Sequence, residues 1–519
     1  MSTRQQAFVV LLIFLSAQVN ALELPRVFSD GMVLQRDLPV SVWGRCEPGE
    51  TVEVQFAERT ASTIADDEGN WSVCLDPLKA SFEAREFVVS SASKKIVFKN
   101  VLVGEVWLAS GQSNMQWPVN KSVDSDLLRL GGTDPYLRLL PMFCRPSAQP
   151  EFTSPMSWVL HSPQAAEKFS AVGYQFARDM RMTLQVPVGI ILCAVGGTSA
   201  IAWTRTKAAS QDPVLQAKLE EWDIALARYD EDLAAWEIEY AAWLEKNGIA
   251  EPDYEIHKRT GAPRMPHGEK SAHRPGNLAN GMISPFAGYT MRGVIWYQGE
   301  EDVQWDPANY GERLKVMIED WRDWWGLDLH FGIVQLPNLK KAEAEPSNNP
   351  WPKFRESQRR LAEADPNTGL VVTIDLGEAN DIHPMNKFPV GRRLARWALT
   401  DVYGMLDLRG GPEVEGAVRE TSSIILNFSQ TGSGLHVNDL HELGGFTASD
   451  SETEPKWGTQ FYPVEAKLRS GTEVELTIPA GKNPIRVRYG WQSNPVDANL
   501  SNKERLPASP FEIALSLCD

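Results

Sequence analysis

A serine stands at the end of an apolar run, among residues whose amides can donate hydrogen bonds. Residues 106–117 read VWLASGQSNMQW, and Ser113 follows a glycine and a glutamine. A strand that presents a hydroxyl at its tip beside such donors provides the setting that a nucleophile needs. The alternative is a turn between a strand and a helix, in which Ser113 or Asn114 caps the helix. The choice depends on whether the other parts of a hydrolytic site occur elsewhere in the chain.

The histidine best placed to serve as a general base is His383, in the segment EANDIHPMNKFPVGRRLA. It follows the apolar run TGLVVTID, which we expect to form a strand, and it precedes a helix that we expect to begin after Pro389. From such a loop an imidazole can reach a serine at the end of a neighbouring strand and remove its proton. The alternative role for His383 is a turn residue that caps the helix.

Two further apolar runs end in groups that can stabilise a negative charge. Gly196 and Gly197 follow VGIILCAV, and a glycine lets a backbone N–H approach a ligand closely. Gln298 follows RGVIWY, and its side-chain amide is a second candidate donor. Together with the backbone N–H of Ser113, these groups would form an oxyanion hole for attack on an ester. The GxSxG nucleophile elbow of α/β-hydrolases is absent, because Met115 holds the fifth position of GQSNM.

The second ring nitrogen of His383 needs an acceptor that fixes the tautomer, and the sequence leaves two alternatives open. Asp381 lies two residues earlier, so in an extended loop both side chains project to the same side. A backbone carbonyl would serve instead in a Ser–His dyad. We favour Asp381, because a charge-assisted hydrogen bond is stronger, although it also suits the cap of a turn. Asp375, at the end of the preceding strand, is the next carboxylate to consider.

The runs that end in these residues have the pattern of a parallel sheet. They are EVWLAS, VGIILCAVGG, RGVIWYQGE, HFGIVQL and TGLVVTID, with amphipathic segments between them. Continuous apolar runs are typical of strands that are buried on both faces by helices, as in α/β domains. Parallel sheets carry their sites beyond the carboxyl ends of the strands, so we expect the residues named above to meet there. We place this catalytic domain at residues 101–405.

The regions on either side of this domain have the residue pattern of short β-strands. Short alternating runs punctuated by Gly, Pro, Asp and Asn predict a β-sandwich at residues 22–100, and a second β-rich domain covers residues 406–519. Within the catalytic domain, apolar residues at steps of four and three predict one long inserted helix at residues 212–248. We expect its apolar stripe to pack on the body of the protein; another helix or a second chain are the alternatives.

The N-terminus and the overall charge limit where the protein works and what it binds. Residues 1–21 combine Arg4, the apolar run AFVVLLIFL and a small-residue cleavage site at Ala21, which predicts a signal peptide and a secreted or periplasmic protein. The net charge of −17 argues against nucleic acid or an anionic membrane as partner. In such a compartment Cys46 and Cys74 could pair, since both lie in the N-terminal β region.

The order of four sequence blocks identifies the family that this chain resembles. GQSNM, GGTSAIAW, WYQGE and DIHP resemble the sialate O-acetylesterase-like group of SGNH hydrolases, and RVFSDGMVLQR, NGMISPF and VRYGWQSNP extend the resemblance over nearly the whole mature chain. It implies a flavodoxin-like three-layer α/β/α domain flanked by β-sandwich elements. It also implies hydrolysis of O-acetyl groups on sugars without a metal or cofactor. Gln112, Asn114 and Glu300 would then support the site, and Ser113 and His383 would react.

The sequence departs from the wider SGNH pattern at two places. Asn380 stands three residues before His383, where that pattern has Asp, and Glu301-Asp302 follow Glu300, where Ser-Asn is common. The resemblance does not separate acetylated sialic acid from acetylated xylan or another polysaccharide. A secreted carbohydrate-binding protein without catalysis is the alternative from another class. The oligomeric state stays open.

Overall fold

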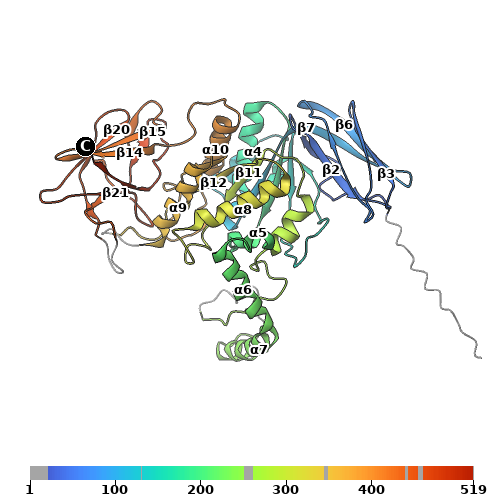
Figure 1. Ribbon diagram of the computed structural model, residues 1–519, viewed down its shortest axis with the longest axis horizontal. Helices are drawn as coiled ribbons and strands as arrows, with labels where there is room; N and C mark the ends of the chain where they lie inside the picture. The colour runs from blue at the N-terminus through green and yellow to red at the C-terminus, as the bar shows by residue number, and fades with distance from the viewer. Residues whose placement is uncertain are drawn as a thin grey trace, which may run out of the picture.

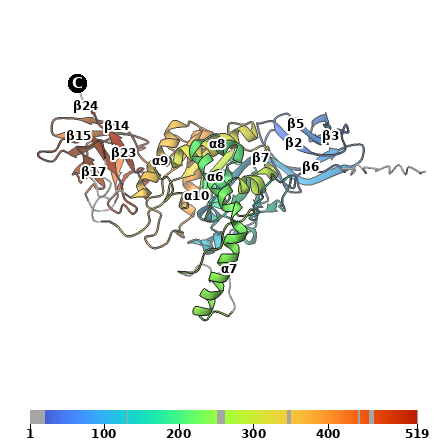
Figure 2. The ribbon, with the colours of Figure 1, turned by 60° about the horizontal axis from the view of Figure 1, so that its bottom comes forward.

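The protein consists of three parts that follow one another along its long axis (Figure 1). The computed structural model describes residues 21–129, 131–250, 261–343, 349–438, 442–453 and 460–517. The expected signal peptide therefore lies outside the described residues, apart from Ala21. A β-rich part at the N-terminus, an α/β body and a β-rich part at the C-terminus succeed one another, and a helical arm projects from the body (Figure 2).

The body is built on a mostly parallel sheet, as the sequence predicts. Its strands lie in the order β13–β12–β11–β7–β10–β8–β9, and only β9 runs antiparallel to its neighbour. Without the edge pair β8 and β9, the chain order of the strands is 2-1-3-4-5, which is the flavodoxin-like order. The strands are β7 (Lys95–Gly111), β8 (Leu137–Pro141), β9 (Val159–Leu160), β10 (Val188–Ala194), β11 (Gly293–Tyr297), β12 (His330–Val334) and β13 (Thr368–Val371).

Helices cover both faces of this sheet and give the expected three layers. Side chains of β11 alternate between the faces, as they do on any strand. Ile295 and Tyr297 pack into the cluster of α4 (Ala171–Leu184) and α10 (Phe388–Trp397). Val294 and Trp296 pack into the cluster of α8 (Tyr310–Trp325) and α9 (Pro350–Ala364). None of the helices in the described ranges has the length and apolar character needed to cross a bilayer.

The N-terminal β part shares a strand with the body. The first half of β7 pairs with β6 (Ser81–Ser90) and β1 (Val33–Gln35), and its second half lies between β10 and β11. The boundary that we expect at residue 100 therefore falls inside a continuous strand. The remaining N-terminal strands are β2 (Val40–Arg45), β3 (Thr51–Phe56), β4 (Arg59–Ile64) and β5 (Asn70–Leu75).

The possible disulfide between Cys46 and Cys74 is wrong, because both thiols are free. Cys46 follows β2 and its N–H bonds the carbonyl of Gly69, whereas Cys74 on β5 lies opposite Ser41 at the other end of the same ladder. Five ladder positions separate them, or roughly 17 Å, which is far beyond the reach of a disulfide.

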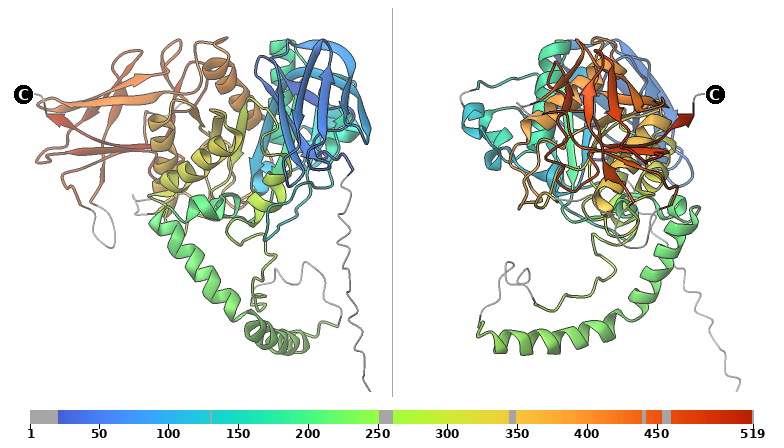
Figure 3. Two further views of the ribbon diagram at one scale, coloured as in Figure 1. Left: turned by 45° about the vertical axis from the view of Figure 1, so that its right-hand side comes forward. Right: turned by 90° about the vertical axis from the view of Figure 1, so that its left-hand side faces the viewer.

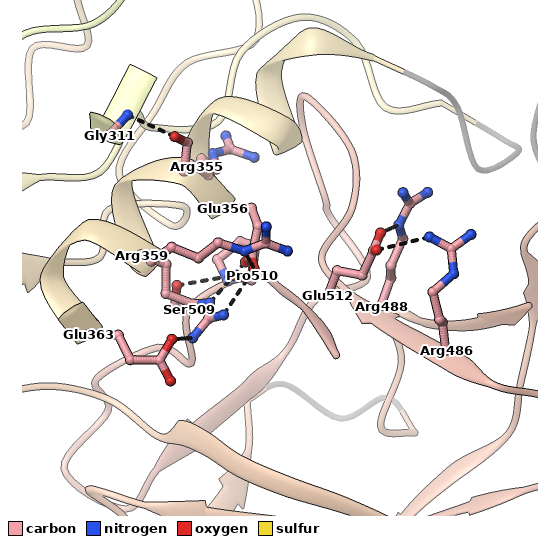
Figure 4. A network of polar contacts seen from close by, with 12 residues as sticks. Gly311, Arg355, Glu356, Arg359, Glu363, Arg486, Arg488, Ser509, Pro510 and Glu512 are labelled. Carbon is pink, nitrogen blue, oxygen red and sulfur yellow. Dashed lines mark hydrogen bonds and ion pairs between the residues drawn. The ribbon is translucent and has the colours of Figure 1, made fainter. Parts of the chain in front are cut away.

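The C-terminal part consists mainly of two small sheets around a core of its own. It is attached to α9 by Arg355, whose buried guanidinium donates to the carbonyls of Gln492 at 2.8 Å and Ser493 at 2.9 Å. Figure 4 shows Arg355 near the ion pairs of α9, and on the C-terminal side Glu512 of β23 (Phe511–Ala514) bonded to Arg486 and Arg488 of the neighbouring strand. The longer strands of the C-terminal part are β14 (Glu413–Arg419), β15 (Ser423–Ser429), β17 (Phe446–Ser449), β20 (Glu473–Thr477), β21 (Arg486–Tyr489) and β23 (Phe511–Ala514).

The arm differs from the expected single helix in two respects. It is divided into α6 (Pro213–Ala227) and α7 (Tyr229–Lys246), which meet at Arg228. It also stands away from the body (Figure 3), and only Leu215 and Tyr240 of its side chains are buried. Its stripe instead meets the chain that returns from the arm, where Trp236 donates to the carbonyl of Pro263 at 3.1 Å. The expectation that the stripe packs on the body is therefore wrong beyond the first turns of α6.

Candidate active site

The end of β7 carries Ser113 to the point where the connections of the sheet diverge. The chain crosses from β10 on one side of β7 to β11 on the other, and such a switch point is where flavodoxin-like sheets bind ligands. Gly111 has a φ of +132°, and a Cβ atom there would collide with the carbonyl oxygen of Tyr297. Gln112 then joins the two strand ends, since its Oε1 accepts the N–H of Gly299 at 3.1 Å. Ser113 follows as the first residue of α1 (Ser113–Gln116).

The predicted nucleophile and base are brought together. Nε2 of His383 lies 2.8 Å from Oγ of Ser113, which is a hydrogen-bond distance. The ring of Trp117 is stacked on the imidazole, with 5.6 Å between centroids and 16° between planes. Burial and the nearby charge of Lys387 lower the pKa of His383 below its usual 6.5, and Asp381 only partly opposes them. The imidazole is therefore neutral near pH 7 and can accept the serine proton.

Asp381 lies beside His383 in the geometry of a turn cap. Its Oδ1 accepts the backbone N–H of His383 at 2.8 Å, and the same atom is 3.8 Å from Nδ1 of the ring. The second distance is too long for a hydrogen bond. Asp375 is held by two bonds of 2.7 and 2.6 Å from Arg393. Among the described residues, no side-chain or backbone acceptor is hydrogen-bonded to Nδ1 of His383.

Hydrogen bonding distinguishes the two glycines that are candidates for the oxyanion hole. The N–H of Gly196 donates to Oε1 of Gln116 at 3.2 Å. Gly197 has a φ of +70°, and within the described ranges neither its N–H nor that of Ser113 has a hydrogen-bond acceptor. Ser113 also opens a helix, where backbone N–H groups lack intrahelical partners. These two N–H groups are therefore the pair available to a ligand oxygen.

The amide of Gln298 is directed at the protein instead of at an open oxyanion position. Its Nε2 donates to the carbonyl of Thr198 at 3.0 Å and to Asp302 at 2.6 Å, while Oε1 accepts the hydroxyl of Tyr310 at 2.6 Å. The side chain is fully buried. Asp302 also accepts the N–H of Ala200 at 2.9 Å, and burial raises its pKa to about 6. Gln298 and Asp302 thus fix the loop that carries Gly197.

A buried polar network supports the loop of His383. Nδ2 of Asn114 donates to the carbonyl of Ile382 at 3.0 Å and also to the carboxylate of Glu300. Oδ1 of Asn114 accepts Nζ of Lys387. Burial lowers the pKa of Lys387 to about 7, against the attraction of Glu300, and burial raises the pKa of Glu300. The expected supporting residues Asn114 and Glu300 therefore meet behind the histidine.

Two members of the site were not predicted from the sequence. Lys387 reaches the network from the residue before α10, and Trp117 stacks on the base from the end of α1. Their only sequence signal is their place four residues after His383 and four residues after Ser113. In the part of the chain that the structure describes, no three His, Cys, Asp or Glu side chains are grouped so that they could hold a metal ion.

Known proteins resemble this chain in both sequence and structure. Residues 103–235 and 278–400 match the family described as carbohydrate esterase, sialic acid-specific acetylesterase, and these ranges include the serine, the histidine and both loops of the site. The sialate O-acetylesterases of Pongo abelii and Homo sapiens are each 26% identical to it, over 93% of this chain and 91% of their own lengths. The crystal structure of a carbohydrate acetylesterase from Xanthomonas citri superposes with a TM-score of 0.76 at 31% identity, covering 95% of this chain and 99% of that one.

Proposed function

Because this chain belongs to the carbohydrate esterase family of sialic acid-specific acetylesterases, we propose that it removes O-acetyl groups from sugars with Ser113 as the nucleophile and His383 as the base. The observation that carries the proposal is the 2.8 Å contact between Nε2 and Oγ at the switch point of the sheet. The backbone N–H groups of Ser113 and Gly197, which have no acceptor among the described residues, follow the ends of the paired strands β7 and β10.

The reaction follows from this arrangement in two steps. His383 accepts the hydroxyl proton as Oγ of Ser113 attacks the acetyl carbonyl. The N–H groups of Ser113 and Gly197 receive the developing oxyanion, and each such donor lowers the barrier by about 3 kcal/mol. The protonated imidazole returns its proton to the sugar oxygen as the C–O bond breaks. Water, activated by His383, then attacks the acetyl-serine and releases acetate.

The remaining predicted residues support this pair in our proposal. Asp381 holds the turn that carries His383 and stabilises the imidazolium electrostatically from 3.8 Å, so the site works as a Ser–His dyad. Gln298 positions the Gly197 loop through Thr198 and Asp302 and does not itself bond the oxyanion. Gln112, Asn114 and Glu300 hold the strand end and the histidine loop.

The natural substrate in this proposal is an acetylated carbohydrate. Two relatives are named sialate O-acetylesterases and the structural neighbour is named a carbohydrate acetylesterase, so acetylated sialic acids and acetylated polysaccharides such as xylan are the substrates to compare. Acetate release should be measured over a panel of O-acetylated sialic acids and acetylated xylans. A kcat/KM that is highest for one group would assign the substrate.

The test of the mechanism is Ser113→Ala. We expect acetate release to fall to background while the melting temperature stays the same, because the side chain is small and half-buried. Ser90→Ala, at the end of β6 in the N-terminal part, is a matched control that should keep full activity, because this half-buried serine lies outside the site. Full activity in Ser113→Ala would reject the proposal.

We also propose that the protein is exported and that cleavage occurs near Ala21. The support is the signal-peptide pattern, together with the fully buried side chain of Leu22 and the backbone pairing of Glu23 with Arg45. A chain that starts at Leu22 keeps both of these contacts. N-terminal sequencing of protein recovered outside the cytoplasm should give Leu22 or a close neighbour; a retained residue 1 would refute export by this route.

A further inference from the structure

The chain that returns from the arm brings a histidine beside the predicted oxyanion loop. Residues 261–275 follow the arm, and a Cβ atom built on Gly197 would lie 3.9 Å from Cε1 of His273. The His273 side chain is half-buried. Its turn is fixed by Ser271, whose Oγ accepts the N–H of His273 at 3.1 Å. An inserted segment therefore forms part of the wall next to the reacting groups.

A series of rings leads from this wall to the arm. The centroid of His273 lies 4.5 Å from that of His267, and His267 lies 5.8 Å from Trp222 on α6. Nδ1 of His267 is 3.1 Å from Oγ of Ser271, so the first two rings share one anchor. Aromatic side chains with a polar edge suit sugars, because the ring contacts C–H groups while the edge meets hydroxyls.

A groove of about 430 Å³ lies at the far end of this series. Trp222, Leu219 and Pro275 give it apolar surface. Its polar lining includes the uncharged Gln216 and the charged side chains of Lys207, Asp223 and Arg274. Its volume and its mixture of one aromatic face with a few polar groups are typical of small-ligand sites. Side chains of both charges in one groove favour a ligand that is rich in hydroxyl groups over one of high net charge.

We propose that Trp222, His267 and His273, together with this groove, form a glycan subsite that binds sugar units next to the acetylated unit at Ser113. The proposal rests on the proposed function, and it gives the projecting arm a role in choosing oligosaccharides over single sugars. The arm presents Trp222 and its returning chain presents both histidines, so the insertion supplies all three rings. Binding there adds affinity for the longer substrate and leaves the acyl chemistry to Ser113 and His383.

The test compares a short and a long substrate in the full-length protein. Trp222→Ala should raise KM for acetylated xylo-oligosaccharides or for an O-acetylated sialyl-oligosaccharide by about tenfold, equivalent to about 1.4 kcal/mol of binding. The rise should be several times larger than any change in KM for p-nitrophenyl acetate, which is too short to reach the groove. The two oligosaccharides show which glycan the groove accepts. His267→Ala, at an exposed position, should act in the same direction if Trp222→Ala fails to fold.

Ile238→Ala is the matched control on the arm. This side chain is 75% exposed on α7, so its removal should leave KM for both substrates unchanged. Equal changes in KM for the short and long substrates in Trp222→Ala and His267→Ala, or no change for either oligosaccharide, would overturn the subsite. Failure of the proposed function would be seen separately, as hydrolysis of p-nitrophenyl acetate that persists in Ser113→Ala.

Discussion

The carboxylate of Asp381 and the imidazole ring of His383 are neighbours, yet no hydrogen bond joins them. Oδ1 of Asp381 accepts the backbone N–H of His383 at 2.8 Å and lies 3.8 Å from Nδ1 of the ring. The carboxylate is about half exposed, so water competes for it. The imidazole is also contacted by the stacked ring of Trp117, and Asn114 bonds the carbonyl of Ile382 beside it, so the orientation of His383 does not depend on this carboxylate alone.

Asp381→Asn should therefore lower kcat by less than about tenfold, in contrast to the roughly ten-thousandfold loss known for a protease whose Asp bonds the catalytic His. The asparagine oxygen can still accept the N–H of His383 and keep the turn. Steady-state kinetics on p-nitrophenyl acetate, with His383→Ala as the inactive reference, give the measurement. A loss of several thousandfold would mean that the carboxylate rotates onto Nδ1 during the reaction.

The pH dependence should have an acidic limb set by His383. The imidazole is active when neutral, and its pKa is lowered from 6.5 by burial and by Lys387. Activity should then be full near pH 7 and fall only as the pH drops through a value below 6.5, because protonation removes the base. A profile of kcat/KM between pH 4 and 8 tests this. A midpoint above 6.5 would contradict the lowered pKa.

Lys387→Met should move this limb to higher pH. Loss of the positive charge removes one of the causes that lower the pKa of His383, so the imidazole would be protonated at a higher pH. The single variant removes the positive charge that attracts the buried Glu300, so the double variant Lys387→Met/Glu300→Gln, which removes both charges, is the safer test. Lys95→Met, at an exposed position at the start of β7, is the charge control. An unmoved limb in the double variant would show that Lys387 does not tune the base.

Gln298→Ala should lower kcat and the melting temperature together. The side chain joins Thr198, Asp302 and Tyr310, so its loss frees the Gly197 loop and leaves buried groups unpaired. Tyr310→Phe, which removes one of these bonds, should reproduce part of both effects. If kcat instead falls by about two to three orders of magnitude at constant stability, Gln298 is a direct oxyanion donor after all.

The sequence predicts the fold and the meeting of Ser113 with His383 better than it predicts the residues that surround them. Apolar runs that end in Ser113, Gly197, Gln298 and the His383 loop indicate strand ends, and parallel topology brings strand ends together. The direction of an amide such as that of Gln298 depends on acceptors from other elements, here Thr198 and Asp302, which no local pattern encodes. Lys387 was missed for the same reason, since its partner Asn114 is 273 residues away.

The arm was mispredicted because periodicity shows that a helix has an apolar stripe without showing what covers it. The stripe is regular through Arg228, yet the backbone there leaves the helical path, and the partner of Trp236 is a proline in the chain that returns from the arm. A single-sequence pattern cannot distinguish such a partner from the body of the protein.

Gly197→Ala tests the oxyanion loop itself. At a φ of +70° an alanine is strained, and relief of the strain turns the N–H of residue 197 away from the position that faces Ser113. We expect kcat to fall by about a hundredfold, as for the loss of one oxyanion donor, with KM nearly unchanged. Gly49→Ala is the matched control, since Gly49 has a φ of +75° in an open turn of the N-terminal part and carries the same backbone cost. Gly49→Ala should lower the melting temperature as much as Gly197→Ala does and keep full activity. If both variants lose only stability, the N–H of Gly197 takes no part in stabilising the oxyanion, and the second donor must come from elsewhere around Ser113.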